Sequence, residues 1–399
     1  MNDVRRMVEQ AVEHNNGILP LEAAWVARDF LPAGRRLGCS EDQYELGERG
    51  GISERWLGST TEADNRVKVP HEGLSFLALA GRDRITLRDA VRDAPNAILG
   101  TEYARTHPAG LNRLAKIFDY KYRIPYHFHQ MKHHAALVGR NPKEEAYYFP
   151  NGVPMGAEPE TYFGVHPSIV EENNMDVLLP YLQQWDSDEI LSQSRAYKLV
   201  PEDGWHVPAG VLHAPGTALT VELQEDSDVF AMLQAVSGGQ KMPKDLLFKD
   251  VRPEDRARYG ERAILDMIDW PANGDPYFYE HHHTPPLIIR ETSDGSEQWI
   301  FYNTSKFSGK RLVVKAEKKL NTRDAGVYNF FVWQGRGLFD GHKIESGRSG
   351  HDEALVCHNK ATENLIVENT GQEDLILFKF YGPDINPDVP MLKHYGKRS

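Results

Sequence analysis

Residues 126–134, YHFHQMKHH, contain four of the seventeen histidines of this 399-residue chain. Tyr126 to His129 read as a β-strand, in which residues two positions apart point to the same face. His127 and His129 would therefore present two imidazoles side by side, which is a common start of a divalent metal site. Two solvated histidines on a surface strand are the plainer interpretation, so the choice depends on whether further ligands occur elsewhere in the chain.

The segment NPKEEAYYF (141–149) offers a third ligand on another strand. Lys143 and Glu145 share one face of this strand, whereas Glu144 points to the other face. At most one of the two glutamates would point inward, and periodicity alone leaves the choice between them open. A buried carboxylate is unfavourable without a partner, so a metal ion with a lysine beside it would make electrostatic sense.

The segment GWHVPAGVLHAPG (204–216) supplies the fourth candidate from a distant part of the chain. Its Pro-Ala-Gly (208–210) indicates a tight turn, and His213 follows where the next strand begins. A Pro-x-Gly-x-x-His string is weak alone, but together with the upstream His-x-His pair it predicts a metal site whose ligands come from separate strands. His206 lies earlier on the same hairpin and is the weaker candidate.

Short strand-like runs separated by turn residues fill most of the chain from about residue 121 onward. Spacing of this kind is typical of β barrels and β sandwiches. Residues 2–14 carry a helical stripe of apolar side chains, and residues 87–91 and 110–117 are also predicted to be helical.

Residues 242–275 differ from their surroundings, because they combine helix-forming charged residues with Leu/Ile/Met periodicity, interrupted at Pro253 and Pro271. Strand-like runs resume after them. We therefore predict a mainly β protein with three parts: an N-terminal metal-binding β domain with helical segments (1–241), a helical connector (242–275) and a C-terminal β domain (276–399).

Composition argues against several classes of protein. The net charge is −12, whereas a nucleic-acid partner requires an excess of Lys and Arg on one face, so none is expected. The N-terminus is charged and no run approaches ~18 apolar residues, so neither a secretory signal nor contact with a membrane is expected. Cys39 and Cys357 lack CxxC spacing, which argues against a thiolate zinc site. We expect a cytoplasmic protein.

Five segments carry a resemblance to a known family: GISERWLGST (51–60), NRLAKIFDYKYRIPYHFHQ (112–130), NPKEEAYYF (141–149), ETYFGVHPSIVEE (160–172) and VPAGVLHAPGTALTVELQEDSD (207–228). Together they are similar to type I phosphomannose isomerase, a zinc-dependent cupin enzyme, over the first 235 residues. The resemblance implies two cupin-type (jelly-roll) β domains with a helical N-terminal segment. It also implies one divalent metal ion, with zinc as the first choice and Mn, Fe, Co or Ni as alternatives.

Transferred position by position, the resemblance implies four metal ligands: His127, His129, Glu145 and His213. His127 stands where the family usually has glutamine, so this site would be richer in nitrogen. The resemblance also implies that Lys143 and Glu222 face a small-molecule sugar substrate. Glu222 would then be an acid or base in an aldose–ketose isomerase, in which a proton moves between adjacent carbons.

One position departs from the family pattern. Where the family has an arginine after its Ser-Asp pair, this chain has Met232, and the stretch that follows is replaced by QAVSGGQK (234–241). Lys241 aligns only loosely with the lysine of the family's stretch at this place. A bidentate cation is a preferred way to hold a phosphate group, and methionine cannot provide one. The sequence therefore favours a neutral, non-phosphorylated sugar.

Two other functions stay open at this point. Three histidines and one glutamate hold Fe(II) or Mn(II) as readily as zinc, so a metal-dependent cupin oxygenase is the main alternative. The loss of the family arginine also fits a non-catalytic sugar-binding cupin. His281, His282 and His283 lie beside a proline-rich turn, and we predict a loop there rather than a second metal site. The oligomeric state is left open, a homo-oligomer included.

Overall fold

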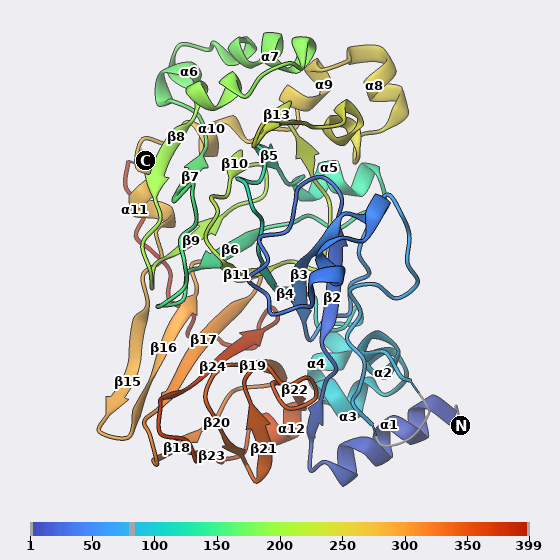
Figure 1. The fold of residues 1–399 in the computed structure, drawn as a ribbon, viewed down its shortest axis with the longest axis vertical. Helices are drawn as coiled ribbons and strands as arrows, with labels where there is room; N and C mark the ends of the chain where they lie inside the picture. The colour runs from blue at the N-terminus through green and yellow to red at the C-terminus, as the bar shows by residue number, and fades with distance from the viewer. Residues whose placement is uncertain (1–2, 80–83, 397–399) are drawn as a thin grey trace.

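The computed structural model describes residues 3–79 and 84–396 (Figure 1). Antiparallel strands dominate it, as predicted. Two sheets of six and five strands form the N-terminal β domain, and sheets of seven and four strands form the C-terminal one. A separate hairpin pairs β13 (Val236–Ser237) with β14 (Gln240–Lys241).

The two N-terminal sheets enclose a hydrophobic core to which both contribute, for example through Phe118 and Tyr147 from one sheet and Phe128 and Phe163 from the other. The six-stranded sheet consists, in spatial order, of β2 (Ala24–Arg28), β3 (Gly51–Leu57), β4 (Leu114–Phe118), β11 (Thr220–Gln224), β6 (Glu145–Tyr148) and β9 (Gly204–Val207). The five-stranded sheet consists of β12 (Ala231–Met232), β5 (His127–Phe128), β10 (His213–Ala214), β7 (Glu160–Phe163) and β8 (Arg195–Lys198).

The C-terminal domain is built on the seven-stranded sheet, which consists of β1 (Ile18–Pro20), β22 (Glu353–Val356), β19 (Tyr328–Gln334), β24 (Leu375–Tyr381), β17 (Ser308–Val314), β16 (Gly295–Phe301) and β15 (Leu287–Thr292). The four-stranded sheet consists of β18 (Lys319–Thr322), β23 (Leu365–Asn369), β20 (Arg336–Phe339) and β21 (His342–Glu345). All these pairings are antiparallel, but only the neighbours β15–β16, β16–β17 and β20–β21 follow one another in the chain; the other neighbouring strands come from distant parts of the sequence.

Helices gather at the two ends of the molecule (Figure 1). At one end lie α6 (Pro167–Glu171), α7 (Leu179–Gln184), α8 (Pro253–Tyr259) and α9 (Arg262–Leu265), and at the other lie α1 (Asp3–His14), α2 (Leu87–Asp93), α3 (Pro95–Leu99) and α4 (Thr101–Thr106). The remaining helices are α5 (Lys132–Leu137), α10 (Trp270–Asn273), α11 (Phe278–His282) and α12 (His358–Ala361), with 3-10 turns at Glu41–Tyr44, Gly47–Arg49, Met175–Leu178, Glu189–Gln193 and Lys244–Phe248.

The connector is helical, as predicted, but its prolines begin helices rather than interrupt them. Pro253 is the first residue of α8 and Pro271 the second residue of α10. A proline is tolerated in the first helical turn because the amide hydrogen that it lacks would have no partner there.

The helix predicted at residues 110–117 is wrong, since this segment contains β4. All five residues of β4 are buried. Ala115 and Ile117 pack in a cluster with side chains of the C-terminal sheet, such as Phe301 and Phe378. A strand buried on both faces loses the alternation by which a strand is recognised, and its apolar spacing then resembles that of a helix.

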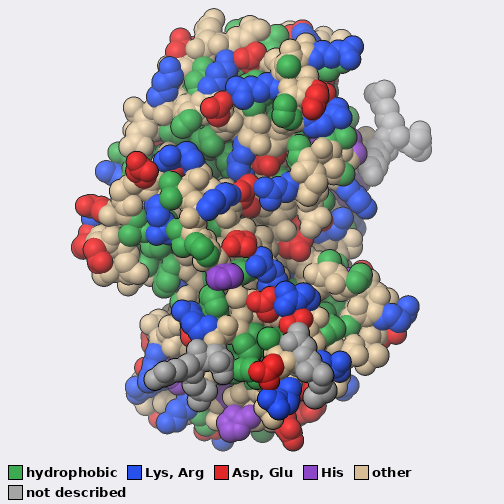
Figure 2. Space-filling view, turned by 90° about the vertical axis from the view of Figure 1, so that its right-hand side faces the viewer, with side chains coloured by type: hydrophobic (Ala, Val, Ile, Leu, Met, Phe, Trp, Pro, Cys, Tyr) green, Lys and Arg blue, Asp and Glu red, His purple; other side chains and the backbone are tan. Residues whose placement is uncertain are grey.

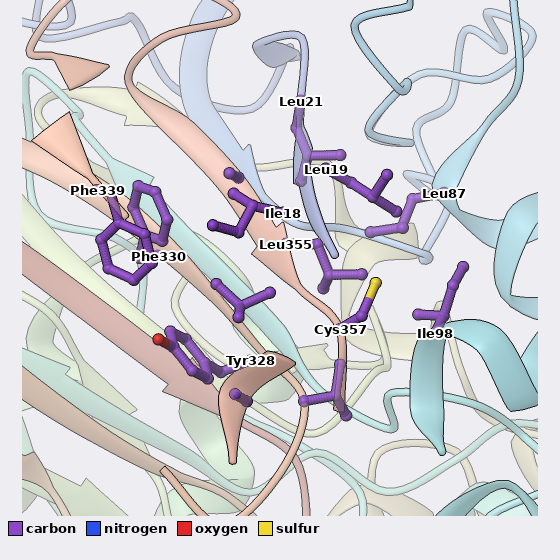
Figure 3. Close-up of a cluster of buried hydrophobic side chains, with 14 of the residues drawn as sticks. Ile18, Leu19, Leu21, Leu87, Ile98, Tyr328, Phe330, Phe339, Leu355 and Cys357 are labelled. Atoms are coloured by element: carbon purple, nitrogen blue, oxygen red, sulfur yellow. The ribbon is translucent and has the colours of Figure 1, made fainter. Parts of the chain in front are cut away.

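The N-terminal segment joins the C-terminal sheet, because β1 pairs with β22 and Leu19 lies opposite Leu355. These residues share one hydrophobic cluster with α2, α3 and β19 (Figure 3), including Leu87, Ile98 and Tyr328. The division of the chain at residues 241 and 275 stays a prediction. What the structure adds is that the first strand completes a sheet formed by the last third of the chain.

On the face shown in Figure 2, Lys and Arg side chains are interspersed with Asp and Glu, and neither sign forms a continuous patch. None of the helices among residues 3–79 and 84–396 combines the length and hydrophobicity of a membrane span.

Leu19→Ala should test the contribution of the first strand. The Leu19 side chain is fully buried, and a truncation of this kind in a packed core lowers the free energy of unfolding by ~2–5 kcal/mol. Urea unfolding followed by circular dichroism measures the change. Ile366→Ala is the control, because Ile366 is 46% exposed and its truncation should change stability by ~0.5 kcal/mol or less. Equal stability of the two variants would show that β1 does not support the C-terminal core.

Candidate metal centre

Three imidazoles from two neighbouring strands meet inside the N-terminal β domain. His127 on β5 lies directly opposite His213 on β10, and His129 follows β5 on the same side as His127. All three side chains are buried, and one ring nitrogen of each lies within 4.8 Å of the others. The structure therefore brings together the three histidines that the sequence singled out.

Backbone carbonyls fix the protonation of these rings. Nδ1 of each ring lies at hydrogen-bond distance from a carbonyl oxygen: His127 from Pro125 (2.7 Å), His129 from Val229 (2.6 Å) and His213 from Val211 (2.8 Å). A carbonyl can only accept, so Nδ1 must carry the proton and Nε2 keeps its lone pair. Metal-binding histidines are oriented in this way.

Glu145 on β6 completes the cluster. Its carboxylate oxygens lie 2.9 Å from His129 Nε2 and 3.0 Å from His213 Nε2, and the Tyr147 hydroxyl donates a hydrogen bond to it. Because Nε2 of His213 has no proton to give, it has no hydrogen-bond partner although it is fully buried. The Lys143 ammonium, 3.0 Å from His129 Nε2, offsets the repulsion between facing lone pairs on one side. A cation between His213 and the carboxylate would offset it on the other side. These four residues therefore fit a divalent metal ion with three nitrogen ligands and one oxygen ligand.

The ionisation of the cluster is consistent with this role. Burial and the nearby imidazoles of His213 and His129 lower the pKa of His127 well below its ordinary value. Burial and the Lys143 ammonium lower the pKa of His129 to about 3. Burial raises the pKa of Glu145, but the charges of Lys143 and the imidazoles outweigh it, so this pKa falls well below its usual range. All these groups are deprotonated at neutral pH, as metal ligands must be.

Lys143 and Glu222, which the resemblance places facing the substrate, lie beside the cluster. Lys143 Nζ is 2.8 Å from Glu145 Oε2 and 3.4 Å from Glu222 Oε1. Burial lowers the pKa of Lys143, but Glu145 and Glu222 raise it above its ordinary value, so the side chain stays a cation. Burial and the Glu145 carboxylate raise the pKa of Glu222 to about 8.

Sequence reasoning missed Lys116, which approaches Glu222 from the other side. Lys116 on β4 pairs directly with Glu222 on β11, and its Nζ is 3.4 Å from Oε1 of that carboxylate. Lys116 also lies 3.7 Å from Glu54, which in turn binds Arg28 at 3.1 Å. A lysine in the apolar run LAKIF was the available signal, but the helical assignment of this segment concealed which way it points.

Glu144 and His206, the two weaker candidates, point away from the cluster. His206 Nε2 is 2.9 Å from Glu144 Oε1, and the Thr304 hydroxyl donates to the same oxygen. The loop predicted at residues 281–283 is wrong for His281 and His282, which form the end of α11. His282 lies against His206, while its neighbours His281 and His283 pair with Asp275 and Asp203. Among residues 3–79 and 84–396, the His127–His129–His213 group is the one whose ligand atoms converge in this way.

Comparisons with known proteins address the fold. No family model matches the chain, and no curated protein matches its sequence. Solved structures are similar to the chain over most of its length. The mannose 6-phosphate isomerase of Bacillus subtilis is similar with a TM-score of 0.60 at 16% identity, over 92% of this chain and 99% of that chain. A phosphomannose isomerase variant from Salmonella typhimurium is similar with a TM-score of 0.61 at 12% identity, over 92% of this chain and 100% of that chain.

The chain has the phosphomannose isomerase fold. A zinc-bound mannose 6-phosphate isomerase has it as well, with a TM-score of 0.60 at 12% identity over 92% of this chain and 100% of that chain. The resemblance seen in the sequence is thereby confirmed at the level of the fold. The phosphomannose isomerase fold encloses the histidine cluster described above, within the N-terminal β domain.

His127→Ala and His213→Ala should each lose the bound metal. The wild-type chain is expected to hold about one ion, and removal of one of four ligands leaves a site with ~10–100-fold lower affinity or worse. Elemental analysis of dialysed protein measures the content. His133→Ala is the matched control, because His133 is exposed and belongs to the same histidine-rich segment.

The two neighbouring glutamates provide a second control for the same prediction. Glu145→Gln should lower the metal content, whereas Glu144→Gln should keep it, since Glu144 faces His206 and Thr304. Loss of metal from Glu144→Gln but not from Glu145→Gln would contradict the direction of β6 in this site.

Proposed function

We propose that this protein is a metal-dependent aldose–ketose isomerase that acts on a neutral sugar. One observation carries the proposal: the buried carboxyl of Glu222, with a pKa raised to about 8, stands beside a metal-binding cluster and between two lysines. Isomerisation moves a proton between adjacent carbons through an enediolate. An acid–base group serves best when its pKa lies near the working pH.

We propose His127, His129, Glu145 and His213 as the ligands of one divalent ion, with zinc as the first choice. Zinc is supported by the nitrogen-rich ligand set and by the zinc-bound structure that shares this fold. When bound, the ion would supply Lewis acidity to substrate oxygens and stabilise negative charge that develops on them.

The chain's own residues provide the proton transfer. We assign the acid–base role to Glu222, whose buried carboxyl lines the metal pocket. The ammonium groups of Lys116 and Lys143, each 3.4 Å away, hold the carboxylate in place. They also lie where a substrate oxygen that gains negative charge would need a positive neighbour.

A metal-dependent oxygenase would use the same four ligands. It would not need an acid–base carboxyl with a raised pKa between two buried lysines. The position of Glu222 between Lys116 and Lys143, beside the ligand cluster, therefore favours isomerisation over oxygenation. It also argues against a purely sugar-binding role, because such a group is unfavourable to keep without chemistry to perform.

The neutrality of the substrate is supported by Arg28, which lines the metal pocket together with Met232. A guanidinium has five N–H donors, and all five are engaged: two with Glu54 (3.1 and 3.3 Å), two with Asp228 (both 3.1 Å) and one with Asn65 (2.9 Å). None remains for a phosphate oxygen. The strand position opposite His127, where a cation would reach the substrate, is occupied by Met232.

Glu222→Gln and Lys143→Met should each lower kcat by ~10²–10⁴-fold, the usual contribution of an acid–base group. Both variants should keep their metal, because neither residue is a ligand. Isomerisation followed by nuclear magnetic resonance and metal analysis of the same samples measures the two properties. Glu171→Gln, on the exposed side of α6, is the control and should match the wild type. Full activity of Glu222→Gln would overturn the proposed mechanism.

The zinc-loaded protein should turn over a neutral hexose with a kcat/KM at least about tenfold above that for the same hexose 6-phosphate. The physical reason is that the pocket has no free guanidinium donor for the phosphate. Steady-state kinetics on both sugars at equal ionic strength measures the ratio. A preference for the phosphorylated sugar would show that a cation outside the metal pocket binds the phosphate.

A further inference from the structure

The metal pocket adjoins a second, larger cavity, which we call the outer cavity. Arg28, Phe30 and Phe230 line both, so these side chains form the partition between them. The metal pocket has a volume of about 50 Å³ and the outer cavity about 730 Å³. The metal pocket is much the narrower of the two, so we expect only part of a substrate to enter it. The remainder of a larger sugar would then lie in the outer cavity, beyond Arg28, Phe30 and Phe230.

The wall of the outer cavity is part apolar and part charged. Phe30, Phe230, Pro243 and Leu246 supply apolar surface. Phe30 stacks on Tyr120, with ring centroids 5.5 Å apart, which holds it at the partition.

Every basic side chain on this wall has a carboxylate partner. Arg66 binds Asp29 at 2.9 Å, Lys68 binds Asp64, and Lys249 lies 3.2 Å from Asp64. Arg28 is saturated by Glu54 and Asp228. A wall with matched charges offers both donors and acceptors but no unpaired cation for an anionic group.

We infer that the substrate is a reducing oligosaccharide, whose carbonyl end enters the metal pocket and whose next sugar ring occupies the outer cavity. This inference rests on the proposed isomerase function. A pyranose ring presents apolar C–H faces and a rim of hydroxyls, which matches apolar side chains surrounded by paired charges. A volume of about 730 Å³ lies within the ~300–1,000 Å³ range of small-molecule sites.

The test compares a free aldohexose with the reducing disaccharide that carries the same hexose at its reducing end. With zinc-loaded protein, kcat/KM should be about tenfold or more higher for the disaccharide, the gain expected when a second apolar subsite is filled. Calorimetric binding of the two corresponding sugar alcohols, which cannot isomerise, gives a readout that is independent of turnover. The disaccharide alcohol should bind more tightly by a similar factor.

Leu246→Trp fills the outer cavity and should lower the disaccharide-to-monosaccharide ratio of kcat/KM by about tenfold. Arg66→Ala should lower the same ratio by a smaller factor. The Arg66 side chain is 66% exposed, so its truncation should not disturb folding. Ile366→Trp, on a distant strand of the C-terminal domain, is the matched control and should leave the ratio unchanged.

Two failures can be told apart. Equal kcat/KM and equal binding for the two sugars, insensitive to Leu246→Trp, would overturn the oligosaccharide inference and leave the isomerase standing. Turnover of neither sugar would overturn the proposed isomerase. A binding preference that persists without turnover would still support the outer cavity as the site of a second sugar ring.

Discussion

The structure depends on one electrostatic constraint, which is that Glu145 is a buried carboxylate facing imidazole nitrogens that have no proton to share. Backbone carbonyls hold the proton of each ring on Nδ1, so Nε2 of His129 and His213 faces the carboxylate with a lone pair. The Lys143 ammonium lies 3.0 Å from Nε2 of His129, whereas Nε2 of His213 has no hydrogen-bond partner. Such an arrangement is unfavourable unless a cation joins it. Its persistence in a well-packed interior is the main reason to read the cluster as a metal centre rather than as a set of core histidines.

The same constraint explains the arrangement of charge around the pocket. Cations and carboxylates alternate from Asp228 through Arg28, Glu54, Lys116, Glu222 and Lys143 to Glu145, with successive contacts of 3.1, 3.1, 3.7, 3.4, 3.4 and 2.8 Å. An alternating row of this kind satisfies each buried charge with a neighbour of opposite sign. It can do so only because β4, β11 and β6 turn their polar residues inward, while Ile117, Val221 and Tyr148 pack outward against the C-terminal sheet.

Sequence patterns singled out the three histidines that the structure brings together, because each of them had a local geometric signature. The His-x-His spacing places His127 and His129 on one face of a strand, and the turn before His213 marks the start of another. The choice between Glu144 and Glu145 stayed open, because strand alternation gives two faces without saying which is inside. Lys116 was missed for a related reason: β4 is buried on both faces and was predicted to be a helix. The pairing of β1 with β22 joins residues more than 300 positions apart, and no local pattern reports a contact of that kind.

The numbers of positive and negative side chains in the metal pocket bear on which substrate a metal-loaded pocket would bind. Arg28, Lys116 and Lys143 face Glu54, Glu145, Glu222 and Asp228, so three positive charges meet four carboxylates, of which Glu222 can be protonated near neutral pH. A divalent ion would make the total positive by one or two charges. That small excess suits an enediolate, which gains its negative charge only as the reaction proceeds. A phosphate would bring its negative charge at the moment of binding and compete for the same excess, which is consistent with the neutral sugar that we propose.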